Sequence, residues 1–329
     1  MANFLVALIS SRLPVPKFML KFLLRSVNAI FKMFKGRNLW SPQEFYALYS
    51  ALALTNSTDR KIDCSTQNDE FTILFVATSK DFVLLPEAIK NAINSMEDFD
   101  IKEVKVYVPD SDIGLARALI PEVFSSLIEV RSENHFFNFK LLSDYFSKTF
   151  PGRGNWCCQQ ILKLYSVLNC QTKFALVVDA DTMLLRKRPW VNTDGNTILM
   201  PSLEYHLPYY LFLRLLGLEI RTPLLSFVPH HMAYRVATLK DILTKFSLSN
   251  LDDYKSNLTS YANPEKISPF CIDYELYGQS EYGTRGAKTN LVRWANLGIN
   301  IRFFLLLQKY PSLWRMTRYF FNSISVHLR

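Results

Sequence analysis

The sequence contains few of the residues that mark fibrous, low-complexity or disulfide-rich proteins. Among its 329 residues are only 10 glycines and 15 prolines, which excludes a collagen-like or low-complexity chain. The five cysteines form no C-x-x-C pair, so no disulfide framework is predicted. No apolar run approaches the roughly 18 residues that a spanning helix needs, which excludes a multi-span membrane protein. What remains is a folded chain with 49% hydrophobic and 14% aromatic residues, long enough for one large domain or two small ones.

Positive charge is concentrated at the two ends of the chain. Residues 1–43 carry seven basic side chains, residues 282–329 carry eight, and neither range contains an acid, so the ends sum to +15 and the middle to −6. This distribution does not favour a nucleic-acid partner; it predicts ends that attach to an anionic membrane surface. The apolar stretch at residues 4–9 is too short for a secretory signal. We therefore expect a cytoplasmic protein, peripheral on the inner face of the cell membrane.

The two ends are predicted to be amphipathic and helical. Near the N-terminus, polar residues recur every three or four positions on an otherwise apolar segment: Lys17, Lys21, Arg25, Asn28, Lys32 and Lys35. Such a narrow cationic stripe is typical of a helix lying in the membrane interface, the alternative being a helix packed on the domain with its lysines in water. Residues 1–69 are thus predicted to hold this helix and a polar linker. Residues 286–329 are predicted to form a basic, aromatic helical segment.

The middle of the chain, residues 70–285, alternates strand and helix patterns. Apolar runs at 71–77, 104–108, 127–130 and 174–178 predict buried strands, and helical spacing predicts helices at 82–96, 115–124 and 155–168. This alternation indicates an α/β fold with a mostly parallel sheet flanked by helices.

The strand at 174–178 runs directly into Asp179 and Asp181, separated by one residue. In open α/β sheets ligands bind beyond the carboxyl ends of the strands, and two carboxylates there can address Mn²⁺ or Mg²⁺. An ordinary acidic turn is the simpler alternative. A phosphoryl-transfer motif, D-x-D-x-T, fits less well, because Met183 holds its fifth position and Thr182 falls one place early.

The acidic motif belongs to a longer series of motifs. W-x-x-Q-Q-x-x-K-L starts at Trp156, D-A-D-T at Asp179, E-Y-H at Glu204, S-F-x-x-H-H-M at Ser226, and Y-E-x-Y-G at Tyr274. In this order they resemble a bacterial group of GT-A-like glycosyltransferases, catalogued largely as a family of unknown function. The resemblance covers about residues 70–285 and implies a GT-A-like, Rossmann-related fold.

The resemblance also implies a metal site and a sugar-nucleotide donor. Asp181 would bind the cation, Asp179 would bind the cation or the nucleotide ribose, and His230 or His231 would be the third ligand. Carboxylate and imidazole suit Mn²⁺, and a cation offsets charge on a departing diphosphate. Of two candidate general bases, Glu275 inherits more from the resemblance than Asp273, because the family pattern usually has Ser at the latter position.

Other polar residues are candidates for donor binding. Four of them share one predicted helical face: Trp156, Gln159, Gln160 and Lys163. On this face Lys163 would bind phosphate, and the two glutamine amides would bind sugar hydroxyls. The alternative is a polar helical face that is only solvated. Thr78 and Asp81 follow the first strand, where GT-A folds contact the nucleotide. We expect a metal-dependent transfer of a sugar from a nucleoside-diphosphate sugar to an envelope glycan or lipid-linked acceptor. A phosphoryl or nucleotidyl transferase and a non-catalytic glycan-binding scaffold are the alternatives.

Overall fold

A computed structural model describes residues 25–26, 69–96, 98–202, 206–220, 226–260, 270–285, 291–292 and 296–327. The predicted N-terminal interface helix and the polar linker lie outside these residues, except that Arg25 and Ser26 are helical. The E-Y-H motif is described only at its last residue, His206.

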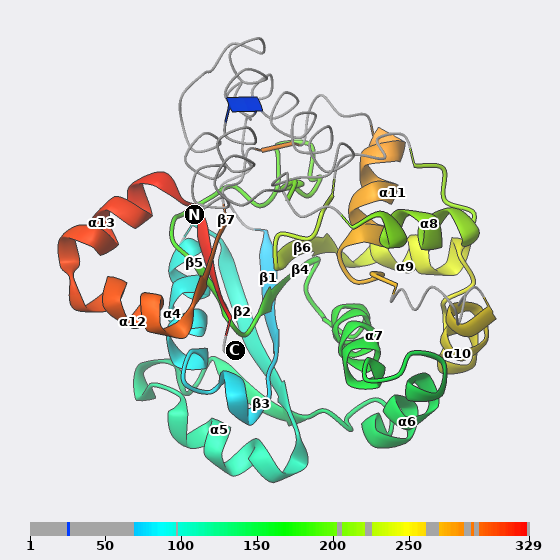
Figure 1. Cartoon of the computed structure of the whole chain (residues 1–329), viewed down its shortest axis with the longest axis horizontal. Helices are drawn as coiled ribbons and strands as arrows, with labels where there is room; N and C mark the ends of the chain where they lie inside the picture. The colour runs from blue at the N-terminus through cyan, green and yellow to red at the C-terminus, as the bar shows by residue number, and fades with distance from the viewer. Residues whose placement is uncertain are drawn as a thin grey trace.

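A five-stranded sheet forms the centre of the molecule, with strand order β3-β2-β1-β4-β6 (Figure 1). Its first four strands are parallel, and β6 runs antiparallel to β4. The strands are β1 (Glu70–Val76), β2 (Asp100–Val108), β3 (Ile128–Ser132), β4 (Phe174–Asp179) and β6 (His231–Arg235). The two central strands, β1 and β4, are buried along almost their whole length, which explains their continuous apolar runs.

Helices cover both faces of this sheet (Figure 1). One face is lined by α4 (Leu85–Ser95), α5 (Ile113–Leu119), α12 (Ile301–Lys309) and α13 (Pro311–Phe320). The other is lined by α6 (Phe139–Thr149), α7 (Gly154–Leu168), α8 (Leu207–Leu215), α9 (Val236–Lys245), α10 (Leu251–Ser260) and α11 (Glu275–Arg285). The predicted class, α/β with a mostly parallel sheet flanked by helices, is confirmed.

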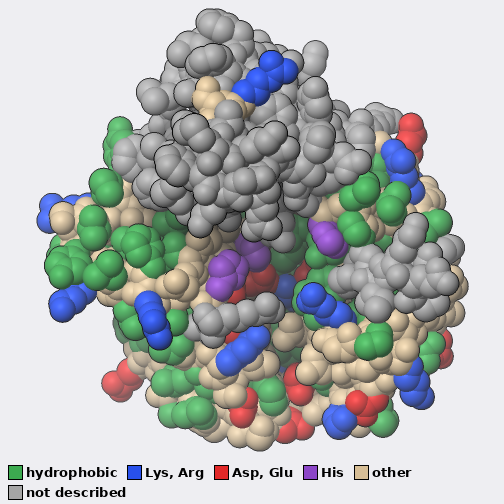
Figure 2. Space-filling view, viewed as in Figure 1, with side chains coloured by type: hydrophobic (Ala, Val, Ile, Leu, Met, Phe, Trp, Pro, Cys, Tyr) green, Lys and Arg blue, Asp and Glu red, His purple; other side chains and the backbone are tan. Residues whose placement is uncertain are grey.

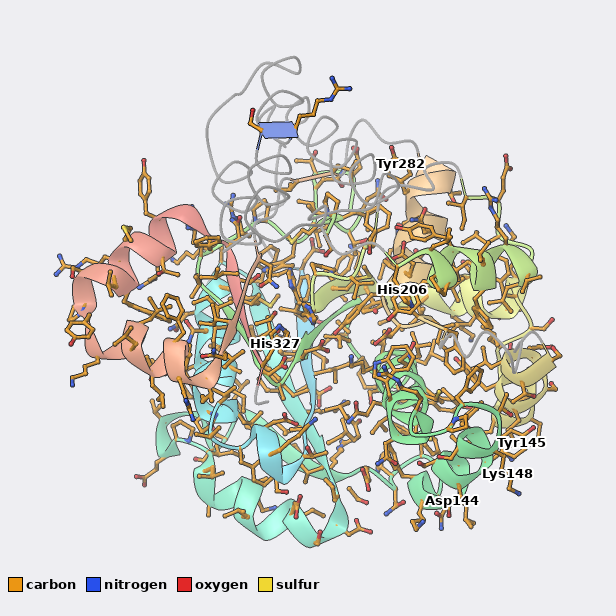
Figure 3. The ribbon with its side chains drawn as sticks, in the orientation of Figure 1. Asp144, Tyr145, Lys148, His206, Tyr282 and His327 are labelled. Carbon is orange, nitrogen blue, oxygen red and sulfur yellow. The ribbon has the colours of Figure 1, made fainter. Side chains whose placement is uncertain are left out.

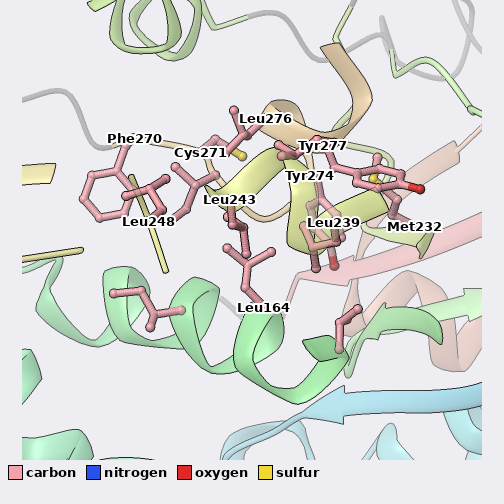
Figure 4. Packing of buried hydrophobic residues seen from close by; sticks show 14 of the residues in the cluster. Leu164, Met232, Leu239, Leu243, Leu248, Phe270, Cys271, Tyr274, Leu276 and Tyr277 are labelled. Carbon is pink, nitrogen blue, oxygen red and sulfur yellow. The ribbon is translucent and has the colours of Figure 1, made fainter. Parts of the chain in front are cut away.

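Two hydrophobic cores lie on the two faces of the sheet. In the first, Leu164 of α7 packs near Leu239 and Leu243 of α9 and the buried segment that leads into α11 (Figure 4). This core holds α7, α9 and the segment before α11 together, and α7 and that segment contribute polar residues to the site described below. The second core joins β1, α4 and the C-terminal elements.

A smaller sheet of order β5-β8-β7 stands beside the main one. It consists of β5 (Thr182–Leu184), β7 (Asn296–Asn300) and β8 (Ser323–His327). Because β5 pairs antiparallel with β8, residues close to the end of the sequence lie against the chain just after Asp181. The helices predicted for this segment are present as α12 and α13, whereas its two strands were not predicted.

The helices of the described residues are short. Among them, no helix is both long enough and apolar enough to cross a membrane.

Candidate functional site

The site lies where β1 and β4 end side by side. Val76 is paired with Asp179 in the parallel register, so the loops after both strands leave the sheet at the same edge. Figure 2 shows a hollow at the centre of this face, with acidic and histidine side chains inside it. His327 and His206 lie on opposite sides of its mouth (Figures 2 and 3). This is the position at which open α/β sheets bind ligands.

Lys163 of α7 is the centre of a polar cluster at the end of β4. Its Nζ lies 2.6 Å from Asp179 Oδ1 and 2.9 Å from Asp273 Oδ2. The hydroxyl of Tyr274 donates to Asp179 Oδ1 at 2.6 Å, and its ring lies under the Lys163 ammonium at 4.5 Å. The cluster thus fixes the Asp179 carboxylate from two elements that are far apart in the sequence.

The charges in this cluster determine its ionisation. Burial alone would raise the pKa of Asp179, but Lys163 and His230 outweigh it and hold that pKa well below its usual value. Burial likewise opposes the charged form of Lys163, yet Asp179 and Asp273 raise its pKa. Both side chains are therefore ionised at neutral pH, and Lys163 cannot act as a base there.

The two adjacent histidines have different environments. His230 Nδ1 lies 3.2 Å from Asp179 Oδ2, and its carbonyl accepts from the Asp179 amide at 2.9 Å. Its φ of 66° lies in the left-handed region, which is uncommon outside glycine and concentrated at functional sites. His231 is fully buried, with Nδ1 2.9 Å from the Pro229 carbonyl oxygen and Nε2 3.3 Å from Met200 Sδ. Burial lowers the pKa of His231 to about 3, so its ring is a neutral part of the core.

Of the two carboxylates in the acidic motif, Asp181 has the weaker set of hydrogen bonds. Its Oδ1 accepts a long hydrogen bond from Thr182 Oγ1 at 3.4 Å, while its main-chain carbonyl accepts from the Val326 amide of β8. Burial first, and then the negative charges of Asp179 and Asp81, raise the pKa of Asp181; His230 and His327 oppose that rise. A carboxylate in this setting is stabilised by an added cation.

His327 was not found from the sequence. It belongs to β8, and it lies close to Asp181 because β8 pairs with β5 directly after the motif. No local pattern identifies a single histidine 146 positions after Asp181. It could have been found only by predicting that residues 182–184 pair with the strand that contains it.

Gln160 is buried and binds main-chain groups, so it is not available at the surface of the hollow. It is 2% exposed; its Nε2 donates to the Phe270 carbonyl at 3.1 Å, and its Oε1 accepts from the Ile272 amide at 2.8 Å. The predicted contact between Gln160 and a sugar hydroxyl does not fit this geometry, because the amide already binds main chain on both sides. Gln160 instead holds the segment that places Asp273 and Tyr274 against Lys163.

The two candidate bases are also occupied. Glu275 is fully buried; its Oε2 accepts from Ser226 Oγ and the Phe227 amide, both at 3.0 Å, and its Oε1 accepts from Gln279 at 2.7 Å. Asp273 is 3% exposed and accepts from Lys163 on one oxygen and from the Tyr274 amide on the other. Neither carboxylate is open to an acceptor hydroxyl in this arrangement, so we propose neither as a base. Glu275 fixes the loop that leads to His230.

The remaining predicted residues lie around the hollow. Thr78 donates from its amide and its hydroxyl to Asp81 Oδ2, at 2.9 and 3.0 Å, which forms a capping box after β1 and places Asp81 near Asp181. Trp156 is half-buried, and its ring stacks on Tyr209 at 6.3 Å. His206 packs edge-on against the same Tyr209 ring, at 4.5 Å. Gln159, also half-buried, follows on the same helix.

The donor types for a divalent cation are present, but they are not gathered. Asp181, His230 and His327 offer carboxylate and imidazole, a set that suits Mn²⁺. Among the described residues, however, no group of three or more His, Cys, Asp or Glu side chains is arranged to hold a metal ion as it stands. Binding would therefore require one or more of these side chains to rotate toward the cation.

Residues 84–222 match the model of DUF6492, a family of unknown function. Over these residues, the match confirms the resemblance to a family of unknown function. No curated protein matches the sequence.

Three solved structures resemble the fold at low identity. A galactosyltransferase, LgtC, in complex with donor and acceptor sugar analogues is 13% identical over 78% of this chain and 86% of that chain, with a TM-score of 0.42. An active-site mutant of LgtC is 12% identical over the same shares of the two chains, with a TM-score of 0.41. Mouse xyloside xylosyltransferase 1 in its apo form is 10% identical over 78% and 97% of the two chains, with a TM-score of 0.39.

Proposed function

We propose that the protein is a metal-dependent glycosyltransferase that moves a sugar from a nucleoside-diphosphate sugar to an envelope glycan or a lipid-linked acceptor. The observation that carries this proposal is the weakly supported carboxylate of Asp181, at the carboxyl end of a buried parallel strand and beside His230 and His327. A structural acid would have its own hydrogen-bond donors, as Asp179, Asp273 and Glu275 do. Asp181 instead favours a cationic ligand.

The residues around Asp181 have supporting tasks. Lys163, Tyr274 and His230 hold Asp179 ionised and immobile, so it maintains a negative potential next to Asp181. Gln160 and Glu275 fix the two segments that bring Tyr274 and His230 into place. The site is thus preorganised by buried hydrogen bonds, and the exposed positions are left for the ligand.

A divalent cation would be held by Asp181, with His230 and His327 as imidazole donors. When bound, it would neutralise the charge that develops on a departing diphosphate. Trp156 and Tyr209 offer an aromatic surface to a sugar ring, and Thr78 lies at the edge of the sheet where a nucleotide would lie.

The test is Asp181→Asn, which keeps the shape of the side chain and removes its charge. We expect Mn²⁺-dependent binding of the nucleoside-diphosphate sugar to fall at least tenfold by isothermal titration calorimetry, since one metal ligand is lost. Asp144→Asn, an exposed acid on α6, is the matched control and should bind normally (Figure 3). Unchanged affinity in Asp181→Asn, for whichever sugar nucleotide the native protein binds, would refute the metal site.

Product analysis separates the alternatives. Release of a nucleoside diphosphate supports glycosyl transfer, and a product that retains nucleoside monophosphate would indicate nucleotidyl transfer. Binding of a glycan without release of any nucleotide would indicate a scaffold.

A further inference from the structure

Helices α12 and α13 present apolar side chains to solvent. They pack on the body through one face, where Phe304 and Leu307 of α12 and Thr317 of α13 are buried. Five large apolar side chains of the two helices remain exposed, to between 41% and 57%: Phe303, Leu305, Leu306, Met316 and Tyr319. We call the outward side of these two helices the α12–α13 face.

Basic side chains share this face. Arg302 and Lys309 lie three or four positions from Leu305 and Leu306, hence on the same side of α12, and Arg315 precedes Tyr319 by four positions on α13. All three cations are exposed, and no acidic residue occurs between positions 282 and 329. Figure 2 shows apolar and basic side chains together over these helices, at the left of the molecule.

We propose that the α12–α13 face is a docking surface for an anionic lipid bilayer. A surface that combines large apolar groups with cations and lacks acids is complementary to acyl chains beneath negatively charged headgroups. Long basic side chains keep their charge at headgroup level while their stems cover apolar surface. A second copy of the chain is a poorer occupant, because two such faces would oppose cation to cation.

The proposal places the candidate site relative to the membrane, and it does not rest on the proposed function. The two helices connect β7 to β8, and β8 pairs with β5 next to Asp181. The small sheet therefore connects the α12–α13 face, where the bilayer would bind, with the hollow that contains Asp181. Since anionic lipids line the cytoplasmic leaflet, the protein is placed on the inner face of the cell membrane.

The first experiment measures sedimentation of the full chain with phosphatidylcholine vesicles, with and without phosphatidylglycerol. The test variant neutralises three cations of the face by replacement with Gln: Arg302, Lys309 and Arg315. The control variant removes equal charge from exposed lysines elsewhere: Lys90, Lys148 and Lys240. At about fivefold per cation, which is about 1 kcal/mol, the test variant should lose about a hundredfold in affinity for the anionic vesicles and the control much less. Equal losses in the two variants would overturn the proposal.

The second experiment distinguishes this face from other lipid-binding segments. An environment-sensitive fluorophore is attached to cysteine in Leu306→Cys and, as a control, in Leu141→Cys on the opposite side of the molecule. Cys64 is replaced by Ser; the cysteines at 157, 158, 170 and 271 are buried. We expect a blue shift only at position 306 and only with anionic vesicles. Sedimentation without a shift at 306 would assign binding to another segment, and a shift that grows with protein concentration alone would identify a second copy as the occupant.

Discussion

Replacing Lys163 with methionine removes the cation that lies between Asp179 and Asp273. Methionine has a similar length and packs well in irregular apolar space, so the change tests charge more than volume. Two carboxylates then remain in the interior without their positive partner. We expect the Lys163→Met protein to fold but with a large loss of stability.

The magnitude follows from the burial of the three groups. The side chains of Lys163, Asp179 and Asp273 are 11%, 23% and 4% exposed. Removing one partner of a buried ion pair costs about 3–5 kcal/mol. Because water screens Asp179 in part, we expect the lower end, about 3 kcal/mol at neutral pH.

The assay is urea unfolding followed by circular dichroism, at neutral and at acidic pH. In the native protein the pKa of Asp179 is depressed, so its stabilising contribution is complete above the ordinary value of 3.8 and is lost as pH falls below it. In the variant that carboxylate loses its cation, its pKa rises, and protonation relieves part of the penalty. The difference between the two proteins should therefore be largest at neutral pH and shrink as pH falls toward about 4.

Two comparisons make the result decisive. Lys148→Met removes an exposed lysine of α6 and should change stability by at most about 0.5 kcal/mol (Figure 3). Lys163→Arg keeps the charge and should recover part of the loss. If Lys163→Met unfolded at the same urea concentration as Lys148→Met at neutral pH, the buried cluster would not contribute as its distances indicate.

Two further predictions concern packing and ionisation. In Gly278→Ala the new Cβ would lie 2.4 Å from Phe227 side-chain atoms, so the thermal midpoint should fall by the equivalent of about 1–3 kcal/mol, whereas Gly283→Ala in the same helix meets nothing within 4 Å and should not destabilise. Burial lowers the pKa of His231 from 6.5 to about 3, so its ring should stay neutral by NMR down to pH 5. The contribution of the neutral ring to stability is complete above pH 6.5 and is lost as pH falls toward 3. A titration midpoint near 6.5 would contradict the burial of this ring.

The central strands and α7 could be predicted because their signals are local. The runs that became β1 and β4 are apolar over nearly their whole length, and α7 begins one residue before its predicted start. The strand β6 was not predicted, since five residues that include His231 and Arg235 carry no alternating pattern. β7 and β8 were missed for a similar reason, because each is stabilised mainly by its neighbour in the small sheet.

The site was predicted in position but not in the tasks of its residues. Asp179, Lys163 and His230 meet at the end of β4, where Lys163 binds a carboxylate and not the phosphate expected for it. Gln160 was predicted to bind a sugar because it shares a helical face with Trp156 and Lys163, and Glu275 was predicted as a base from the family resemblance. Among their partners are main-chain groups 110 and 48 positions away, at Phe270 and Phe227, which no spacing rule connects to them. A single sequence does not distinguish a buried polar residue that positions a segment from a polar residue that binds a ligand.

The pairing of β5 with β8 makes the candidate site a product of distant segments. Thr182 and Ser325, which pair in register, are 143 positions apart, so this contact has a high contact order and forms only after the ordering entropy of the intervening chain is lost. The segment matched by the family, residues 84–222, contains the acidic motif but neither β8 nor His230. A fragment cut at those limits, or a nascent chain that has not reached residue 327, would therefore carry the two aspartates without the strand and the histidines that surround them. Donor binding should consequently develop late in refolding, after the main sheet has formed.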